Sequence, residues 1–173
     1  MTYLDWFNHR RLHGDVTTDA SYTTPLMRPT RHHNLNRTNR RGATMEIRPH
    51  APSMKGPAER FTGDVWIDAI AQPTDDATAS VAAVHFSPGA RSAWHSHSTG
   101  QTLCVTEGKG LVQSRGEPIL VIRPGDVIWT PSDEWHWHGA THDHTMTHLS
   151  ITDGQATWGD HVTDDEYHTH HDH

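Results

Sequence analysis

Histidine is the residue type that stands out in this chain, and two of the histidines have a spacing that suits metal binding. The sequence holds 18 histidines among 173 residues. His95 and His97 are two residues apart, so on a strand both side chains project from the same face. Imidazole is the commonest metal ligand among protein side chains. The pair is a weak signal by itself, and it indicates a metal centre only if further ligands lie nearby.

The chain after Met45 consists of short segments of alternating polarity, which is typical of an antiparallel β sandwich or barrel. Turns that contain Gly, Pro or Asp separate the segments. The predicted strands are Val65–Ala69, Val81–Phe86, Gln101–Val105, Gly110–Ser114, Ile119–Ile122, Asp126–Thr130, Glu134–His138 and Thr145–Ile151. Thr163 and Glu166 have the spacing of a capping box, which predicts one short C-terminal helix. The expected fold class is therefore all-β.

Length and composition favour a single soluble domain with a single site. Cys104 is the only cysteine, which excludes an internal disulfide and a cysteine-rich zinc site. The segment Met1–Arg11 is too polar for a signal peptide or a membrane helix. We therefore expect a cytoplasmic protein that does not engage a membrane.

Residues 1–44 differ in charge from the remainder of the chain. They contain seven arginines and three aspartates, which gives them a net charge of +4. The overall net charge is −7, so the remaining residues must carry −11. An acidic body argues against nucleic-acid binding, because phosphate contacts require clustered Lys and Arg. Residues 1–44 also lack periodicity, which predicts a disordered basic lead.

The first 14 residues contain Tyr3-Leu-Asp-Trp-Phe-Asn-His-Arg-Arg-Leu-His-Gly14, which resembles the C-terminal end of the catalytic domain of insertion-sequence transposases. The acidic catalytic triad of those enzymes is absent from the resembling stretch. Our hypothesis is that residues 1–44 are a fused remnant or follow a misplaced start codon, with Met45 as the natural start. The alternative is a functional basic arm.

Two stretches place histidines within ordered glycine and proline spacings. The first has Gly89, His95, His97, Gln101 and Gly108 separated by five, one, three and six residues, and the second has Gly125, Pro131, Asp133 and His136 separated by five, one and two. These stretches resemble the paired motifs of the cupin family. The resemblance implies a single-domain jelly-roll barrel, or double-stranded β-helix, over residues 45–173 with its core at about 80–152.

The cupin resemblance also implies a metal site. Its ligands would be His95, His97, Gln101 and His136. Gln101 stands where the family usually has Glu, which leaves the ligand set uncharged and the ion a stronger Lewis acid. Nitrogen and oxygen ligands without thiolate suit Mn(II) or Fe(II), and Zn(II), Ni(II) and Co(II) are alternatives; we place Mn(II) first. Two other departures, Asp133 for Gly and Ala140 for Asn, remove no histidine.

Two further histidines are candidates for acid–base catalysis near this ion. His138 shares the strand parity of His136, and His148 lies on the next predicted strand. Either could accept a proton, or instead orient the metal ligands through hydrogen bonds. Inward-facing Ala82, Val84 and Phe86 are expected to line a partly apolar substrate pocket.

The other aromatic and histidine residues have simpler expected roles. Trp129, Trp135 and Trp137 are expected to be core and rim aromatics. The remaining C-terminal histidines are expected to be exposed: His142, His144, His161, His168, His170, His171 and His173.

The resemblance extends beyond the two motifs to most of the chain between Met45 and Tyr167. The segments that carry it include Lys55–Gly63, Pro88–His97, Gly100–Leu103, Pro124–Val127, His136–Ala140, Met146–Leu149 and His161–Tyr167. Together they resemble the manganese-dependent cupin hydroxynitrile lyases, known as (R)-mandelonitrile lyases, in which Gln is the fourth ligand. The resemblance implies reversible cleavage of a cyanohydrin to a carbonyl compound and hydrogen cyanide, with His138 or His148 accepting the hydroxyl proton.

Two other functions remain compatible with a metal-binding barrel of this kind. One is a metal-dependent dioxygenase, and the other is a non-catalytic barrel that binds a small ligand or a metal. In each case the expected partner is a small molecule. Small cupins commonly form dimers or tetramers, so a homo-oligomer is expected.

Overall fold

The protein folds into two antiparallel sheets that enclose a common interior. The structure is a computed structural model that describes residues 45, 47–49, 51–74 and 78–168. The predicted basic lead and His170, His171 and His173 lie outside the described residues. Among the described residues, no helix has the length and apolar character needed to cross a membrane.

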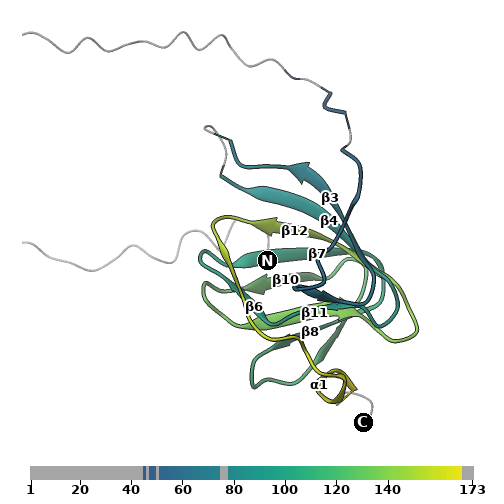
Figure 1. Ribbon diagram of the computed structural model, residues 1–173. Coiled ribbons are helices and arrows are strands. Elements are labelled where there is room, and N and C mark those ends of the chain that lie inside the picture. The colour runs from purple at the N-terminus through teal and green to yellow at the C-terminus, as the bar shows by residue number, and fades with distance from the viewer. Residues whose placement is uncertain (1–44, 46, 50, 75–77, 169–173) are drawn as a thin grey trace, which may run out of the picture. The chain divides into compact units, whose positions relative to one another are not determined.

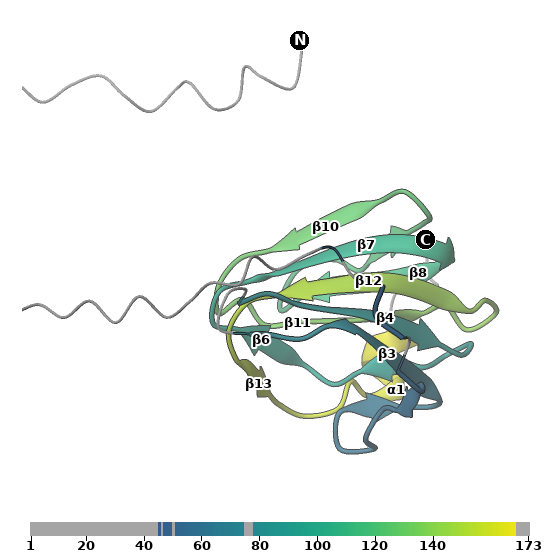
Figure 2. The ribbon, with the colours of Figure 1, turned by 90° about the horizontal axis from the view of Figure 1, so that it is seen from above.

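The first sheet contains the longest strands of the fold. Its order is β1 (Met54–Lys55), β3 (Val65–Ala71), β4 (Ser80–Phe86), β12 (Met146–Thr152), β7 (Gln101–Gly108) and β10 (Val127–Thr130). Figure 1 shows these strands above β6, β11 and β8 of the second sheet, and Figure 2 shows the same arrangement from above.

The second sheet is built from shorter strands. Its order is β13 (Ala156–Trp158), β6 (His95–His97), β11 (His136–Ala140), β5 (Arg91–Ser92) and β2 (Phe61–Thr62), with β8 (Gly110–Ser114) paired to β11 and to β9 (Leu120–Ile122). The pairing of β6 with β11 places His95 opposite His136. This register brings two distant segments of the chain to one point in the interior.

Each sheet has two distinct faces because side chains alternate along a strand. The inner faces meet in one apolar cluster, which includes Val84, Phe86, Val105 and Met146. A second cluster lies around Trp94, Leu111, Trp137, Val162 and Tyr167. Tyr167 belongs to α1 (Asp164–His168), and its hydroxyl donates to the Ala140 carbonyl at 2.7 Å, so the C-terminal segment is attached to β11.

The structure confirms the predicted all-β class and the short terminal helix. The Glu166 amide donates to Thr163 Oγ1 at 3.2 Å, and the Thr163 amide donates to Glu166 Oε2 at 2.8 Å, as a capping box requires. The strands β1, β2, β5, β6 and β13 are absent from the predicted strands, because segments of two or three residues are too short to show alternation.

The turn residue Asp133 occupies a position where the cupin motif usually has glycine. Its backbone has a φ of 61°, the only positive value for a non-glycine residue in the described part of the chain. Aspartate is one of the few side chains that tolerates this left-handed region. The departure therefore leaves the turn before His136 intact.

Candidate metal centre

Four histidines on two neighbouring strands converge in the interior. His95 and His97 lie on β6, and His136 and His138 lie on β11, with 1–7% of each residue exposed. The ring centroids of His95 and His136 are 4.3 Å apart, and those of His95 and His138 are 5.2 Å apart. The period of two along each strand thus places all four imidazoles on the inner face.

Backbone carbonyls fix the orientation of two of these rings. Nδ1 of His95 lies 2.9 Å from the Ala93 carbonyl, and Nδ1 of His136 lies 2.9 Å from the Glu134 carbonyl. A carbonyl oxygen only accepts, so in each neutral ring Nδ1 carries the proton. Nε2 therefore presents a lone pair to the interior, which is the form that binds a metal ion.

Gln101 presents its carbonyl oxygen to the same point. Its Nε2 donates to Ser150 Oγ at 3.0 Å, and its Oε1 lies 2.9 Å from His136 Nε2. Since His136 already holds its proton on Nδ1, two lone pairs face each other across this gap. A cation bound by both atoms removes the repulsion, and two adjacent ligands about 2.1 Å from an octahedral ion are about 3.0 Å apart.

Two observations concern the remaining ligands. His97 Nε2 is buried and has no hydrogen-bond partner among the described residues. The ligand atoms of His95, His136 and His138 all lie within 4.8 Å of one another. His138, which we expected beside the ion, is therefore a member of this group together with two of the predicted ligands, and the group does not include His97. The set of His95, His97, Gln101 and His136 fits a divalent ion and stays a prediction.

Burial keeps these imidazoles uncharged. Desolvation lowers the pKa of His95 to about 3 and that of His97 to about 4, with the neighbouring His136 as the next cause in both. Burial also lowers the pKa of His136, against the opposing hydrogen bond to Glu134. The site is thus a group of neutral lone-pair donors at neutral pH, as metal binding requires.

His138 and His148 form a second pair behind the first. Nε2 of His148 lies 3.2 Å from Nδ1 of His138, and both residues are buried. His138 Nε2 and His148 Nδ1 have no partner among the described residues. Burial lowers the pKa of His148 to about 4. Burial also lowers the pKa of His138 well below 6.5, and repulsion between the two imidazoles when both are protonated is the next cause. The structure thus brings together the two histidines that the sequence singled out.

The predicted pocket residues lie on the inner face of β4. Val84 and Phe86 are buried and Ala82 is partly buried, whereas His85 points outward with 40% of its side chain exposed. The Phe86 ring centroid lies 5.8 Å from that of His138 and 5.6 Å from that of His148. An apolar wall therefore borders the histidine pair.

Two residues near the site were missed by the sequence reasoning. Ser150 orients the Gln101 amide, and its shared parity with His148 on β12 was a usable signal. Trp158 stacks on His95, with ring centroids 4.7 Å apart and an interplanar angle of 24°. Nothing in the sequence predicted β13, so no signal pointed to Trp158.

The expected outer histidines and tryptophans can also be located. His142, His144, His161 and His168 are exposed, as predicted. Trp137 is fully buried, Trp135 is partly buried, and Trp129 is 62% exposed on the outside of the first sheet.

The fold and the histidine cluster together define a jelly-roll barrel with a site that could hold a metal ion, and residues 82–152 match the family described as the cupin domain. This chain belongs to the cupin family. A protein of Granulicella tundricola named (R)-mandelonitrile lyase is 51% identical to it over 119 residues, which are 66% of this chain and 91% of the relative.

Solved structures show the same architecture. A cupin-like protein from Thermotoga maritima superimposes with a TM-score of 0.65 and 39% identity, covering 71% of this chain and 95% of the other. A polyketide cyclase from Streptomyces resistomycificus has a TM-score of 0.57 at 16% identity, covering 72% of this chain and 91% of the other. The second likeness concerns the fold alone.

Proposed function

We propose that this protein is a metal-dependent lyase that reversibly cleaves cyanohydrins to a carbonyl compound and hydrogen cyanide. The observation that carries the proposal is the buried His138–His148 pair, which lies against His95 and His136 and beside the apolar ring of Phe86. The 51% identity to an (R)-mandelonitrile lyase supports the same reaction.

His95, His97, Gln101 and His136 would hold the ion, and we propose Mn(II), with Fe(II), Zn(II), Ni(II) or Co(II) as alternatives. When bound, the ion supplies a Lewis acid at the hydroxyl end of the substrate. The Ala93 and Glu134 carbonyls keep the Nε2 lone pairs of His95 and His136 directed at it. The side chains of Phe86 and Val84 exclude water from the organic part of the substrate.

In the proposed reaction His138 acts as the base. Its Nε2 has no partner among the described residues and accepts the hydroxyl proton while its Nδ1–H donates to His148 Nε2. The carbon–oxygen double bond forms as the carbon–cyanide bond breaks, and cyanide leaves with the electron pair. Because burial makes the His138 imidazolium unfavourable, the proton passes readily to cyanide, which leaves as hydrogen cyanide.

The test is elemental analysis of the purified protein, followed by release of benzaldehyde and cyanide from racemic mandelonitrile by the Mn-loaded sample. We expect His136→Ala to lose both metal and turnover. His138→Ala should retain metal and lose about 100-fold or more in kcat, a typical contribution of a general base. The matched control is His144→Ala, which removes an exposed histidine.

Other outcomes would point elsewhere. Stoichiometric metal without cleavage of any cyanohydrin would reject the lyase. Oxygen uptake with phenolic or diketone substrates would then indicate a dioxygenase. No activity in either assay would indicate a non-catalytic cupin that binds a small ligand or a metal.

We further propose that two copies of this chain associate through the outer face of the first sheet. The alternation along β10, β12 and β3 directs large apolar side chains outward, with exposed fractions of 66% for Val127, 62% for Trp129, 37% for Ile151 and 52% for Ile70. Trp129 and Ile151 both pair with Thr102, and Ile151 pairs with Val81, so they form one row across the sheet.

The size and composition of this outer face favour a second copy as its occupant. With about 200 Å² for a tryptophan and somewhat less for an aliphatic side chain, the exposed apolar area is on the order of 400 Å², comparable to the largest apolar patch of a typical monomer, which is often functional. It is a large part of the ~800 Å² that each partner contributes to a stable interface. The row carries no charge between Trp129 and Ile70, and an uncharged row can pair with the same row of a second copy.

A further inference from the structure

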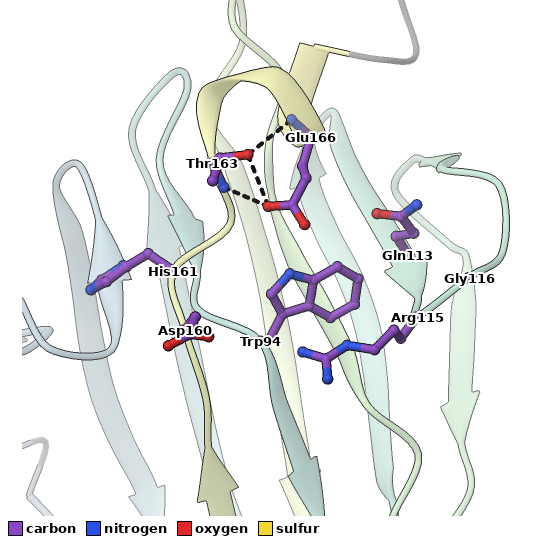
Figure 3. Close-up of a pocket in the computed structure, with 8 residues that line it drawn as sticks. All are labelled: Trp94, Gln113, Arg115, Gly116, Asp160, His161, Thr163 and Glu166. Atoms are coloured by element: carbon purple, nitrogen blue, oxygen red, sulfur yellow. Dashed lines mark hydrogen bonds between the residues drawn. The ribbon is translucent and has the colours of Figure 1, made fainter.

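The protein has a hollow on the side of the second sheet that faces away from the histidines. Its volume is about 660 Å³, within the range of small-molecule sites. Trp94 lies at its centre, with Arg115 and Gln113 on one side and Asp160 and His161 on the other (Figure 3). Trp94 immediately precedes His95, so alternation directs its ring away from the metal centre. We call this hollow the outer pocket.

Arg115 is fixed in the outer pocket by two indole rings. Its guanidinium carbon lies 4.9 Å from the ring centroid of Trp94 and 4.9 Å from that of Trp135. Its amide donates to the Trp135 carbonyl at 2.8 Å, which anchors the backbone. The structure shows no hydrogen bond from the guanidinium to any described residue. A flat cation held between two rings keeps its N–H edge available, and this edge matches a carboxylate.

The acidic groups of the outer pocket are not equivalent. Glu166 is engaged by the helix cap, since its Oε2 accepts from the Thr163 amide at 2.8 Å and from the Thr163 hydroxyl at 2.9 Å. Asp160 is different: its backbone carbonyl accepts from the Trp94 amide at 3.0 Å, but its carboxylate has no hydrogen bond or ion pair within the described part of the chain. Asp160 is therefore the lining carboxylate without such a partner in the described part of the chain, whereas Glu166 lies close enough to Arg115 for the guanidinium to contribute to the lowering of the Glu166 pKa.

No ion pair joins Arg115 to Asp160 among the described residues, and both residues are exposed, so each side chain is accessible to a ligand. In Figure 3 the Arg115 guanidinium extends beneath Trp94 towards the side on which Asp160 lies. A ligand with only a carboxylate would pair with Arg115 but place its negative charge near that of Asp160. A ligand with only an ammonium group would pair with Asp160 but place its positive charge near that of Arg115. A ligand with both charges satisfies the two groups together.

We propose that the outer pocket binds a small zwitterion of the amino-acid class, with its carboxylate on Arg115 and its ammonium group on Asp160. The nonpolar part of the ligand would lie against the edge of the Trp94 ring that lines the outer pocket. This site is separate from the metal centre and is independent of the lyase activity. Its position behind His95 places the ligand one sheet away from the interior.

Three probes that share one phenyl ring test the proposal: L-phenylalanine, 3-phenylpropanoate and 2-phenylethylamine. The second lacks the ammonium group, and the third lacks the carboxylate. Binding is measured by calorimetry and by shifts of the indole N–H signals in NMR spectra of the intact chain. We expect L-phenylalanine to bind at least tenfold more tightly than either analogue.

Charge-neutralising variants assign each half of the ligand. Arg115→Gln should reduce L-phenylalanine affinity to that of 2-phenylethylamine, and Asp160→Asn should reduce it to that of 3-phenylpropanoate. Arg123→Gln, which alters an exposed arginine elsewhere, should leave affinity unchanged. His136→Ala should also leave it unchanged, which excludes chelation at the metal centre. Equal affinity for the three probes, no binding of any at 10 mM, or insensitivity to both pocket variants would overturn the proposal.

Discussion

Ser150 Oγ lies 3.0 Å from Nε2 of Gln101, and this one hydrogen bond determines which end of the Gln101 amide faces His136. Without it, the amide could rotate and donate its N–H to His136 Nε2, an arrangement that satisfies both groups but removes the oxygen lone pair from the metal centre. Ser150 is therefore a positioning residue for Gln101, the predicted fourth ligand.

Ser150→Ala should weaken metal binding by about tenfold, the lower end of the effect of lost hydrogen bonds to metal ligands. Calorimetric titration of metal-free protein with Mn(II) measures the affinity directly. Ser150→Thr retains a hydroxyl and should restore most of it. Equal affinities in wild type and Ser150→Ala would show that Gln101 needs no such support.

Trp158 should contribute to the orientation of His95. Its indole stacks on His95, and the Arg60 guanidinium carbon lies 5.2 Å from the centroid of the same indole. Trp158→Leu should lower the free energy of unfolding by about 1–2 kcal/mol, from the aromatic contact and the lost burial.

The matched variant for this position is Trp158→Phe, which keeps an aromatic ring. Its free energy of unfolding should fall by less than half as much as that of Trp158→Leu. Urea unfolding of the metal-free protein gives the free energy, and Mn(II) affinity should follow the same order of variants. If leucine and phenylalanine behave alike in both measurements, stacking on His95 has no role in either property.

The metal-free protein should become less stable as the pH falls from 6.5 to 5. Burial lowers the pKa of His95 to about 3 and the pKa values of His97 and His148 to about 4, so in this window the unfolded chain binds protons that the folded chain does not. Each such histidine lowers the free energy of unfolding by up to about 1.4 kcal/mol per pH unit.

Urea unfolding in the presence of a chelator at pH 7, 6 and 5 measures this slope. His148→Gln should remove the contribution of one histidine to the change of the free energy of unfolding with pH. His144→Ala, at an exposed position, should leave this pH dependence unchanged. A stability that is constant across the window would mean that these histidines are already protonated in the folded protein.

The proposed dimer should separate when a charge is placed on the outer face of the first sheet. Trp129→Lys puts a charge at a residue with 62% exposure, so folding should be retained. Light scattering should then give the mass of a monomer. Glu107→Lys, at another exposed position, is the control and should leave the mass unchanged.

Cys104 offers a second measurement on the same surface. It lies on β7 directly between Val127 and Leu149 and is partly exposed. In the wild type, alkylation of Cys104 should be slower at high protein concentration, and Trp129→Lys should remove this dependence. A wild-type protein that is monomeric at all concentrations would contradict the interface.

Much of the site was predictable because strand periodicity acts over short distances. His95 and His97 share a face whatever the rest of the fold does, and the same applies to His136 and His138. The motif spacings added the turns on either side. What could not be predicted was the pairing across strands, since register depends on contacts between distant segments.

The consequences of register appear at particular residues. The contact between His138 and His148 depends on how β11 and β12 cross the interior, and the stack of Trp158 on His95 depends on a three-residue strand. The outer pocket joins the end of β8 to the segment before α1, 45 residues later. No local pattern at Arg115 or Asp160 indicates that they line one hollow.

The amide at position 101 also affects what the interior attracts. None of the four predicted ligands carries a negative charge, so a divalent ion held by them keeps its full +2 charge inside a barrel that water enters poorly. Such a site would favour small anions over neutral molecules of the same size. Under the proposed lyase activity, cyanide would be retained until it takes up its proton and leaves as hydrogen cyanide, and azide or formate should inhibit the reaction by binding in its place.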